Sequence, residues 1–391
     1  MIFKIPIAWL QLKYEKNRLL VGIAGISFAV VLMFMQLGFR SALFDSAVRL
    51  HTSLQGDIFL ISPRSTSLIA MLSFSSRRLY QTLAFPEVEF VTPIYLGFAQ
   101  WKNPQNPIYW RNIHIIGFEI KYPVFDLVGL QLYQQNLQNP DVVLFDKNSR
   151  PEFGEVAQSF HQYGLVQTEI DNRATGIRAI STIGLFELGT SFGVDGNLMT
   201  SDVNFLRIFS QRQSNEIDLG MIKVKPGTNI DLFKQKIQKY LPDDVRVFSK
   251  LELIEFEKAY WMNSTAIGFI FDLGVGMGLI VGIVFVYQIL YTNVSDNLSE
   301  YATLKAIGYT QRYLINHILK QALILAFFGY IPGLFIASIL YKIARGATLL
   351  PIKMESTRSG LILILTFVMC FISGAIALNK LRAVDPADIF D

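Results

Sequence analysis

Four long apolar stretches dominate the pattern of hydrophobic and polar positions along the chain. They cover residues 19–40, 264–291, 318–341 and 360–379. A helix needs about 20 apolar residues to cross roughly 30 Å of hydrocarbon, because its backbone polar groups must be hydrogen-bonded within the helix itself. The pattern therefore predicts four transmembrane helices.

The first apolar stretch, 19–40, has two interpretations, because it lies close to the start of the chain. It could be a secretory signal peptide or an uncleaved membrane anchor. Its apolar run is longer than the usual core of a signal peptide, and no small-x-small cleavage pattern follows it. We favour the uncleaved anchor.

The lysine and arginine residues near the apolar stretches predict the orientation of the chain, since short loops rich in these residues stay in the cytoplasm. One side collects Lys4, Lys13, Lys16, Arg18, Lys305, Arg312, Lys320, Lys380 and Arg382; the other short loop holds Lys342, Arg345, Lys353 and Arg358. The amphipathic N-terminal segment 1–18, the connection 292–317 and the tail 380–391 are therefore predicted to be cytoplasmic. Residues 41–263 and the short loop 342–359 are predicted on the opposite side.

Residues 41–263 are numerous enough for a domain with its own core, and their pattern predicts a mixed α/β fold. Segments rich in β-branched and aromatic residues predict strands at 57–61, 90–101, 112–118, 219–224 and 245–248, and an amphipathic pattern predicts a helix at 229–240. The α/β lobe is expected over about 41–120 and 211–249, with 121–210 as an inserted lobe. Residues 250–263 are expected to form a stalk helix that leads to the second span.

Composition excludes several classes of protein. With 51% hydrophobic and 17% charged residues, the chain is too apolar for an ordinary soluble domain. The net charge of +4 comes from scattered cations that flank apolar segments, which argues against nucleic-acid binding. The single cysteine, Cys370, excludes an intrachain disulfide, and the four histidines show no metal-ligand spacing.

No motif of an enzyme is present in the sequence. A nucleotide-binding loop of the form GxxxxGK[ST] is absent, so the chain is not expected to hydrolyse ATP by that route. The carboxylate pair Asp243 and Asp244 follows Pro242 in a predicted turn, which indicates a solvated role. We predict neither catalytic residues nor a metal site.

Two stripes of glycine predict close helix packing, because small residues let helix backbones approach each other in a membrane. Glycines recur every four residues as Gly274, Gly278 and Gly282 in the second span and as Gly329 and Gly333 in the third. The partner helix could belong to the same chain or to a second copy. Pro332 removes a backbone donor from the third span and predicts a kink there.

Asp272 is the carboxylate that lies well inside a predicted span. A charge at the bilayer centre costs about 2.5 to 3.5 kcal/mol on insertion scales, so something should compensate it. A capping, outer-leaflet or neighbour-paired role is one interpretation. A part in gating or in substrate contact is the other.

The cytoplasmic stretch 297–313, NLSEYATLKAIGYTQRY, resembles the coupling segment of the MacB/FtsX/LolC superfamily of ABC-transporter permeases. In that superfamily an acidic residue is followed by a short run. The run consists of leucine, then lysine or arginine, then alanine, then a hydrophobic residue and then glycine. The matching residues here are Glu300, Leu304, Lys305, Ala306, Ile307 and Gly308, with Tyr301 and Arg312 in the same segment. The tail LRAVDPADIF, with Asp385-Pro386, and the layout of four helices around one large domain also resemble this superfamily.

Two segments, 7–44 and 286–309, look like the DevC branch of the superfamily, whose permeases lack a fused nucleotide-binding domain. This resemblance implies a MacB-like fold in a bacterial inner membrane, with the large domain in the periplasm. It also implies a homodimer that works with a separate DevA-like ATPase, a DevB-like periplasmic adaptor and a TolC-like outer-membrane channel. ATP and magnesium would then be bound by the ATPase and not by this chain.

The resemblance implies a mechanotransmitter that drives export of a lipid, a glycolipid or another hydrophobic substrate. Leu304 and Ile307 would dock in a groove of the ATPase, while Glu300, Lys305 and Arg312 would provide polar contacts. The alternative is an FtsX-like signal transducer that activates a periplasmic cell-wall hydrolase. The size of the domain at 41–263 favours export, since it exceeds that of an FtsX-type loop.

Overall fold

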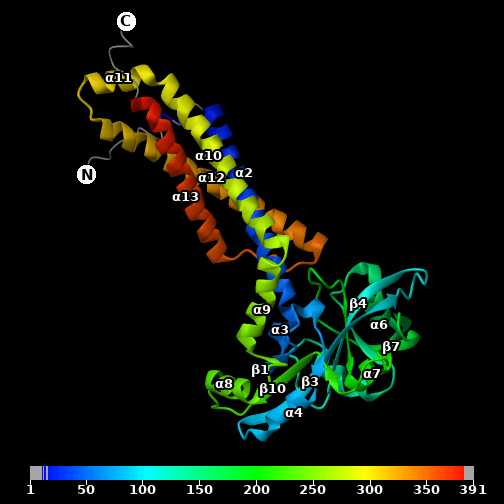
Figure 1. The fold of residues 1–391 in the computed structure, drawn as a ribbon. Helices are drawn as coiled ribbons and strands as arrows, with labels where there is room; N and C mark the ends of the chain where they lie inside the picture. The colour runs from blue at the N-terminus through cyan, green and yellow to red at the C-terminus, as the bar shows by residue number, and fades with distance from the viewer. Residues whose placement is uncertain (1–10, 12, 15, 383–391) are drawn as a thin grey trace. The chain divides into compact units, whose positions relative to one another are not determined.

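The computed structural model describes residues 11, 13, 14 and 16–382, which fall into two compact units (Figure 1). The helical unit comprises the described parts of Met1–Ala42, Ala266–Thr348 and Ile352–Asp391, and the α/β domain comprises Leu43–Thr265 and Leu349–Pro351. Most of the predicted segment 1–18 and of the tail 380–391, including Asp385-Pro386, lies outside the described residues.

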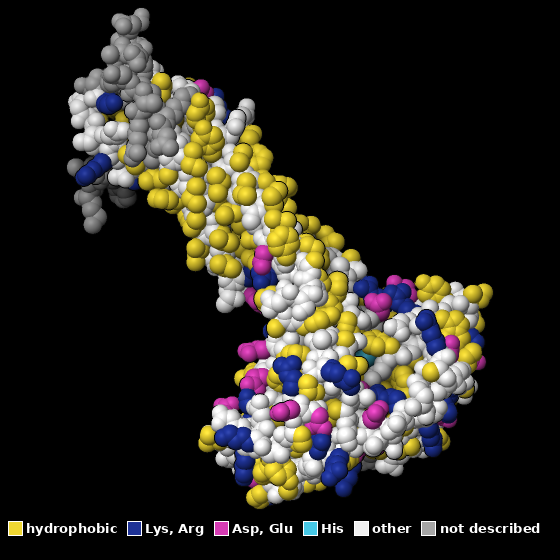
Figure 2. All heavy atoms as spheres, in the orientation of Figure 1, with side chains coloured by type: hydrophobic (Ala, Val, Ile, Leu, Met, Phe, Trp, Pro, Cys, Tyr) yellow, Lys and Arg dark blue, Asp and Glu magenta, His cyan; other side chains and the backbone are white. Residues whose placement is uncertain are grey.

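The helical unit is built from long apolar helices. They are α2 (Lys16–Ala47), α10 (Ala266–Asp296), α12 (Gln311–Thr348) and α13 (Ser356–Arg382), and the short α11 (Leu298–Ala306) connects α10 to α12. Among the helices of the described residues, these four are long and apolar enough to cross a membrane. Figure 2 shows hydrophobic side chains over much of their visible face, and Phe269 and Phe335 are among the exposed ones. Such a surface is stable in lipid and unstable in water.

The predicted stalk helix is present as α9 (Lys250–Asn263) and is separate from α10. The hydroxyl of Ser249 accepts a hydrogen bond from the backbone N–H of Glu252, and the carboxylate of Glu252 accepts one from the backbone N–H of Ser249, which forms a capping box. At the other end, Ser264 and Thr265 are not helical. The hydroxyl of Thr265 donates to the carbonyl of Trp261 at 2.6 Å, so the chain turns before α10 begins.

The α/β domain contains a nine-stranded sheet in the order β11-β1-β10-β3-β4-β8-β5-β7-β6. Its strands are β1 (Ile58–Ile61), β3 (Val88–Lys102), β4 (Trp110–Phe118), β5 (Val142–Asp146), β6 (Val166–Asn172), β7 (Gly176–Phe186), β8 (Asn197–Ser201), β10 (Leu219–Val224) and β11 (Arg246–Ser249). A separate ribbon pairs β2 (Phe74–Ser75) with β9 (Glu216–Ile217). The five strands predicted from the sequence are therefore present as β1, β3, β4, β10 and β11.

Short helices complete the domain. They are α3 (Arg49–Ser53), α4 (Arg77–Gln81), α5 (Leu130–Tyr133), α6 (Val156–Tyr163), α7 (Asp202–Ile208) and α8 (Ile230–Tyr240), with 3-10 turns η1 (Leu68–Ala70), η2 (Thr82–Ala84), η3 (Gln134–Gln138) and η4 (Pro151–Phe153). The helix predicted at 229–240 is α8. Asn229 caps it by accepting a hydrogen bond from the backbone of Leu232 at 3.1 Å.

The long strand β3 belongs to two arrangements at once. Its first half pairs with β10, whereas Gln100 and Trp101 near its end pair with β6. The strands β3, β4, β8, β5, β7 and β6 therefore close into a ring. The expected inserted lobe at 121–210 supplies β5 to β8, but β3 and β4 from outside that range complete the ring, so 121–210 is not a lobe on its own.

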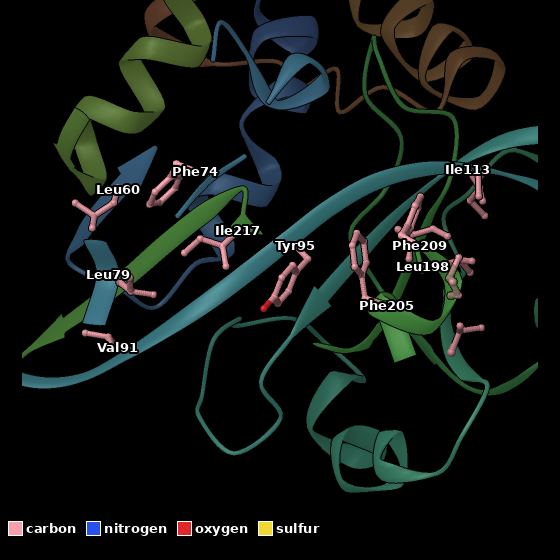
Figure 3. Close-up of a cluster of buried hydrophobic side chains, with 14 of the residues drawn as sticks. Leu60, Phe74, Leu79, Val91, Tyr95, Ile113, Leu198, Phe205, Phe209 and Ile217 are labelled. Atoms are coloured by element: carbon pink, nitrogen blue, oxygen red, sulfur yellow. The ribbon is translucent and has the colours of Figure 1, made fainter. Parts of the chain in front are cut away.

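Both faces of the sheet are buried, because its strands carry apolar residues at successive positions. In β1, Ile58 and Leu60 belong to one hydrophobic cluster, and Phe59 and Ile61 belong to another. Figure 3 shows part of the first cluster, where Leu60 and Leu198 lie in the same core. Residues 41–120 and 121–210 thus share one core, which is the physical reason why the two predicted lobes are not independent.

Candidate functional site

The strongest functional signal of the sequence lies on α11 and the turn that follows it. Gly308 has a φ of +102°, a conformation that L side chains rarely adopt. The backbone of Gly308 donates to the carbonyl of Lys305 at 3.1 Å, and the backbone of Tyr309 donates to the carbonyl of Leu304 at 3.0 Å. This pair of bonds is a Schellman motif, so the glycine of the coupling pattern is required by the end of the helix.

The inner face of α11 packs on the helices at either side of it. Tyr301 is 4% exposed and belongs to a small cluster with Val294, Leu314 and Ile318. Leu304 is partly buried against the same cluster. Of the predicted coupling residues, these two therefore hold α11 on α10 and α12 and leave little surface for a partner.

Further predicted coupling residues lie on the exposed side of α11, in the turn after it and at the start of α12. Glu300, Lys305 and Arg312 are exposed, and Ile307 is 71% exposed. Two further exposed side chains, Tyr309 and Tyr313, contact each other with ring centroids 4.8 Å apart and ring planes tilted by 43°. The sequence interpretation missed this pair, because Tyr309 lies before the first residue of α12 and helical spacing does not apply to it.

The glycine stripes of α10 and α12 face α2 of the same chain. A side chain added at Gly274 would meet Gln36, and one added at Gly278 would meet Met33 at 3.2 Å. On α12, a side chain at Gly333 would meet Val30 at 2.7 Å, and one at Gly329 would meet Ile26. The close helix packing that the stripes predict is thus found within the chain.

The fifth glycine of the two stripes lies where three helices meet. A side chain added at Gly282 of α10 would meet Met369 of α13 and would lie 3.0 Å from Ala29 of α2. Small residues are therefore needed on this face of α10 for two neighbours.

Asp272 of α10 forms an ion pair with Arg40 of α2. The pair supplies the compensation that a carboxylate inside an apolar helix requires, and it supports the neighbour-paired interpretation. Arg40 is the last residue of the first predicted span, so its position was visible in the sequence, but its partner 232 residues away was not.

A group of polar side chains that the sequence interpretation missed lies beside α11. Gln321 is 0% exposed and Asn293 is 5% exposed, and they are hydrogen-bonded to each other at 3.1 Å. Further bonds connect them to Gln11, Asn297 and His317. The available signal was the spacing of four between Asn293 and Asn297 and between His317 and Gln321.

Glu257 is a buried acid of the α/β domain that joins three elements. Glu257 of α9 accepts a hydrogen bond from the backbone of Leu68 at 2.7 Å and another from the indole of Trp261 at 2.8 Å. Its Oε2 lies 3.8 Å from Nε2 of His51 on α3. Burial raises the pKa of Glu257 to about 7 and lowers the pKa of His51 to about 4.

No group of three or more His, Cys, Asp or Glu side chains that could hold a metal ion occurs among the described residues.

Comparisons with known proteins give similarities of sequence and of structure. Residues 273–386 match the family described as FtsX-like permease C-terminal. In the comparison with curated proteins, none matches this chain.

Two solved structures are similar to part of the chain. The periplasmic region of MacB from Actinobacillus actinomycetemcomitans is 13% identical with a TM-score of 0.37, over 52% of this chain and 92% of that one. The extracellular domain of the noncanonic ABC-type transporter YknZ from Gram-positive bacteria is 13% identical with a TM-score of 0.34, over 49% of this chain and 98% of that one.

The sequence match contains α11, α12 and α13 completely and most of α10. It therefore includes the Schellman turn, the exposed face of α11 and the members of the buried polar group other than Gln11. Over residues 273–386 the chain is therefore similar to FtsX-like permeases, and this similarity includes the helix that carries the coupling pattern.

Proposed function

We propose that this chain is the membrane-spanning permease subunit of an ABC system whose ATPase is a separate polypeptide, and that α11 is the element on which the ATPase acts. The observation that carries the proposal is the two-sided geometry of α11 inside a segment that matches FtsX-like permeases. One side is fixed to α10 and α12 through Tyr301 and Leu304. The other side presents Ile307 with the charged residues around it.

The finer assignment rests on the sequence resemblance to the DevC branch. In this proposal two copies of the chain assemble with two copies of a DevA-like ATPase, a DevB-like adaptor and a TolC-like channel. The protein lies in a bacterial inner membrane with both termini in the cytoplasm and the α/β domain in the periplasm. ATP and magnesium are bound by the ATPase, and this chain has no catalytic residues of its own.

The proposed mechanism is mechanotransmission. Closure of the ATPase dimer pushes on α11, and because α11 is packed on α10 and α12, the movement passes into the membrane-spanning helices. The α/β domain then uses that movement to export a lipid, a glycolipid or another hydrophobic substrate. The substrate class rests on the resemblance alone.

The test is purification of the tagged full-length chain in mild detergent, followed by identification of the proteins that accompany it. The proposal expects an ABC ATPase together with a periplasmic adaptor. Recovery of a cell-wall hydrolase activator would support the FtsX-like transducer in its place. The chain alone is expected to show no ATP hydrolysis above background, and steady turnover by the purified chain would contradict the assignment.

A single substitution tests the role of α11. Ile307→Asp places a charge on the exposed face and is expected to abolish recovery of the ATPase while membrane insertion is retained. The matched control is Ile108→Asp, since Ile108 is 92% exposed and lies in the α/β domain. Leu304 is less suitable, because a charge there would also disturb the cluster beneath α11. Undiminished ATPase recovery with Ile307→Asp would refute docking on this face.

A further inference from the structure

A chain of polar side chains lies beside α11 in the helical unit. Its members are Gln11, Asn293, Asn297, His317 and Gln321, which we name the polar relay. They come from four parts of the sequence: the N-terminal region, α10, the residue before α11, and α12. Burial of amides as deep as that of Asn293 and Gln321 costs free energy unless the amides are hydrogen-bonded.

The hydrogen bonds of the polar relay follow one direction. The side-chain amide of Asn297 donates to Oδ1 of Asn293 at 2.9 Å, and the amide of Asn293 donates to Oε1 of Gln321 at 3.1 Å. The amide of Gln321 then donates to Oε1 of Gln11 at 2.9 Å. Asn293 and Gln321 each accept a hydrogen bond through the side-chain oxygen and donate the next one through the side-chain nitrogen.

The last acceptor of the polar relay is Oε1 of Gln11. Nε2 of His317 lies 2.9 Å from the same Oε1 of Gln11, and with a proton on Nε2 the histidine donates to it. Gln11 then accepts two bonds, which is the capacity of a carbonyl oxygen. Aligned amides polarise one another, so such a chain resists separation more than its single bonds would.

The relay is attached to α11 at two points. Asn297 is the residue that precedes the first turn of α11, and its amide also donates to the carbonyl of Asn293 at 2.9 Å. The ring of Tyr301, on the inner face of α11, contacts the ring of His317 with centroids 6.3 Å apart. Any displacement of α11 therefore acts on both ends of the relay.

We propose that the polar relay transmits the movement of α11 to α10, to α12 and to Gln11, which precedes α2 in the sequence, with Gln321 as the positioning residue at its centre. This inference rests on the proposed function of α11. Apolar contacts such as those of Val294 and Ile318 allow helices to slide over one another, whereas amide hydrogen bonds fix one register. If one segment moved alone, a buried amide would lose its partner, so the segments move together.

The first test uses Gln321→Leu in the full-length chain with the ATPase that copurifies with the wild type, reconstituted in lipid nanodiscs. The ATPase is expected to remain bound, because the exposed face of α11 is unchanged. The stimulation of ATP hydrolysis by the permease is expected to fall about threefold or more, because the variant removes the bonds of Gln321 to Asn293 and to Gln11, and about threefold corresponds to the average loss of one such bond in a membrane. Normal stimulation with Gln321→Leu would overturn the proposal.

The matched control is Thr366→Val on α13. Thr366 is as deeply buried as Gln321, but its hydroxyl donates at 2.7 Å to Ile362 of the same helix. The control removes a buried polar group without removing a bond between segments. It is expected to leave stimulation unchanged, and an equal loss with Thr366→Val would show that burial alone explains the effect.

A double variant separates transmission from stability. Asn293→Leu combined with Gln321→Leu removes both partners of the central bond, and replacing both is nearly neutral for stability. In the double variant the side-chain amide of Asn297 still donates to the backbone carbonyl of residue 293, and Gln11 still bonds to His317. Each remaining member of the relay therefore keeps a hydrogen bond. Stability in a denaturing detergent titration is expected to recover while ATPase stimulation stays low; recovery of both would refute transmission.

The two proposals fail in different ways. If no ATPase accompanies the wild-type chain, the proposed function fails and the relay fails with it. If an ATPase binds and is stimulated by the wild type and equally by Gln321→Leu, the relay alone is rejected.

Discussion

Substitution of Gly329 by alanine tests the packing of α12 on α2. A methyl group at this position would lie 2.5 Å from Cβ of Ile26, far inside van der Waals contact. Ile26 is β-branched and its Cβ is tied to the backbone, so the side chain cannot rotate away and the helices must separate. Separation also strains the hydrogen bond from the hydroxyl of Ser27 to the carbonyl of Gly329, which is 2.8 Å long.

The magnitude follows from three contributions. Overpacking costs about 1 to 3 kcal/mol. Loss of the Ser27 bond adds about 0.6 kcal/mol, the average for such bonds in membrane proteins. The higher helix propensity of alanine returns about 1 kcal/mol. The net expectation is a loss of roughly 0.6 to 2.6 kcal/mol in the free energy of unfolding.

The matched control is Gly346→Ala on the same helix. No heavy atom of the described residues outside the local backbone lies within 4 Å of a methyl group added there, so only the gain in helix propensity remains. Both variants can be compared with the wild type by titration with a denaturing detergent, with helix content followed by circular dichroism. Equal stability of the two variants would refute the packing of α12 on α2 at Gly329.

Two further predictions concern ionisable groups. The folded-state pKa of Glu257, about 7, lies above its ordinary value of 4.5, so its stabilisation is complete below pH 4.5 and is lost as the pH rises through 7. Glu257→Gln should therefore gain stability relative to the wild type as the pH rises from 4.5 to 7, by up to about 1.4 kcal/mol per pH unit. Denaturation followed by Trp261 fluorescence measures this gain, and a difference between variant and wild type that does not change with pH would contradict the prediction. The second prediction is that Arg40→Leu lowers stability in the membrane more than the double variant Arg40→Leu/Asp272→Leu does. The single variant leaves the carboxylate of Asp272 without Arg40, whereas the double variant removes both charges. Equal losses of stability in a detergent titration would show that the ion pair is dispensable.

His51 determines whether the pH effect of Glu257 is visible in the wild type. Its folded-state pKa, about 4, lies below its ordinary value of 6.5, so its contribution to stability is lost as the pH falls from 6.5 toward 4. This slope opposes that of Glu257 between pH 4.5 and 6.5. The comparison of Glu257→Gln with the wild type removes the histidine contribution, which is why the difference and not the absolute stability is informative.

The membrane spans were predictable because the bilayer imposes a strong local requirement. Each span is a largely apolar run, and the four long helices contain the predicted spans except for Ser264 and Thr265, which precede α10. The strands of the α/β domain were readable for a similar reason, since β1 and β10 match their predicted ranges closely. A local sequence pattern is sufficient to predict a segment when the residues of that segment alone determine its environment.

The closure of the sheet was not predictable from local pattern. Gln100 and Trp101 pair with Asp171 and Ile170, about seventy residues further along the chain. A strand shows the same alternation of side chains whichever strand lies beside it, so the pattern of β3 contains no information about β6. The boundary predicted at 121–210 followed composition, and composition does not record which strands share a core.

The coupling segment shows where resemblance and structure contribute different information. The pattern of the sequence identified residues 297–313 as one functional unit, but it did not say which side chains face inward. In the structure, Tyr301 and Leu304 face the cluster on α10 and α12, and Ile307, which follows the last helical residue, is exposed. The roles of docking and of support are therefore expected to belong to different residues of the same motif.

The length of α11 explains why its support is needed. It has nine residues, and isolated helices shorter than about 12 residues are marginal in water. A helix of this length keeps its shape only through contacts outside itself, and here these are the Schellman turn at Gly308, the buried ring of Tyr301 and the bond from Asn297 to Asn293. A force on its exposed face would otherwise unfold it. Because these contacts lead directly into α10 and α12, the interactions that keep α11 folded are the same ones that would carry its movement into the membrane.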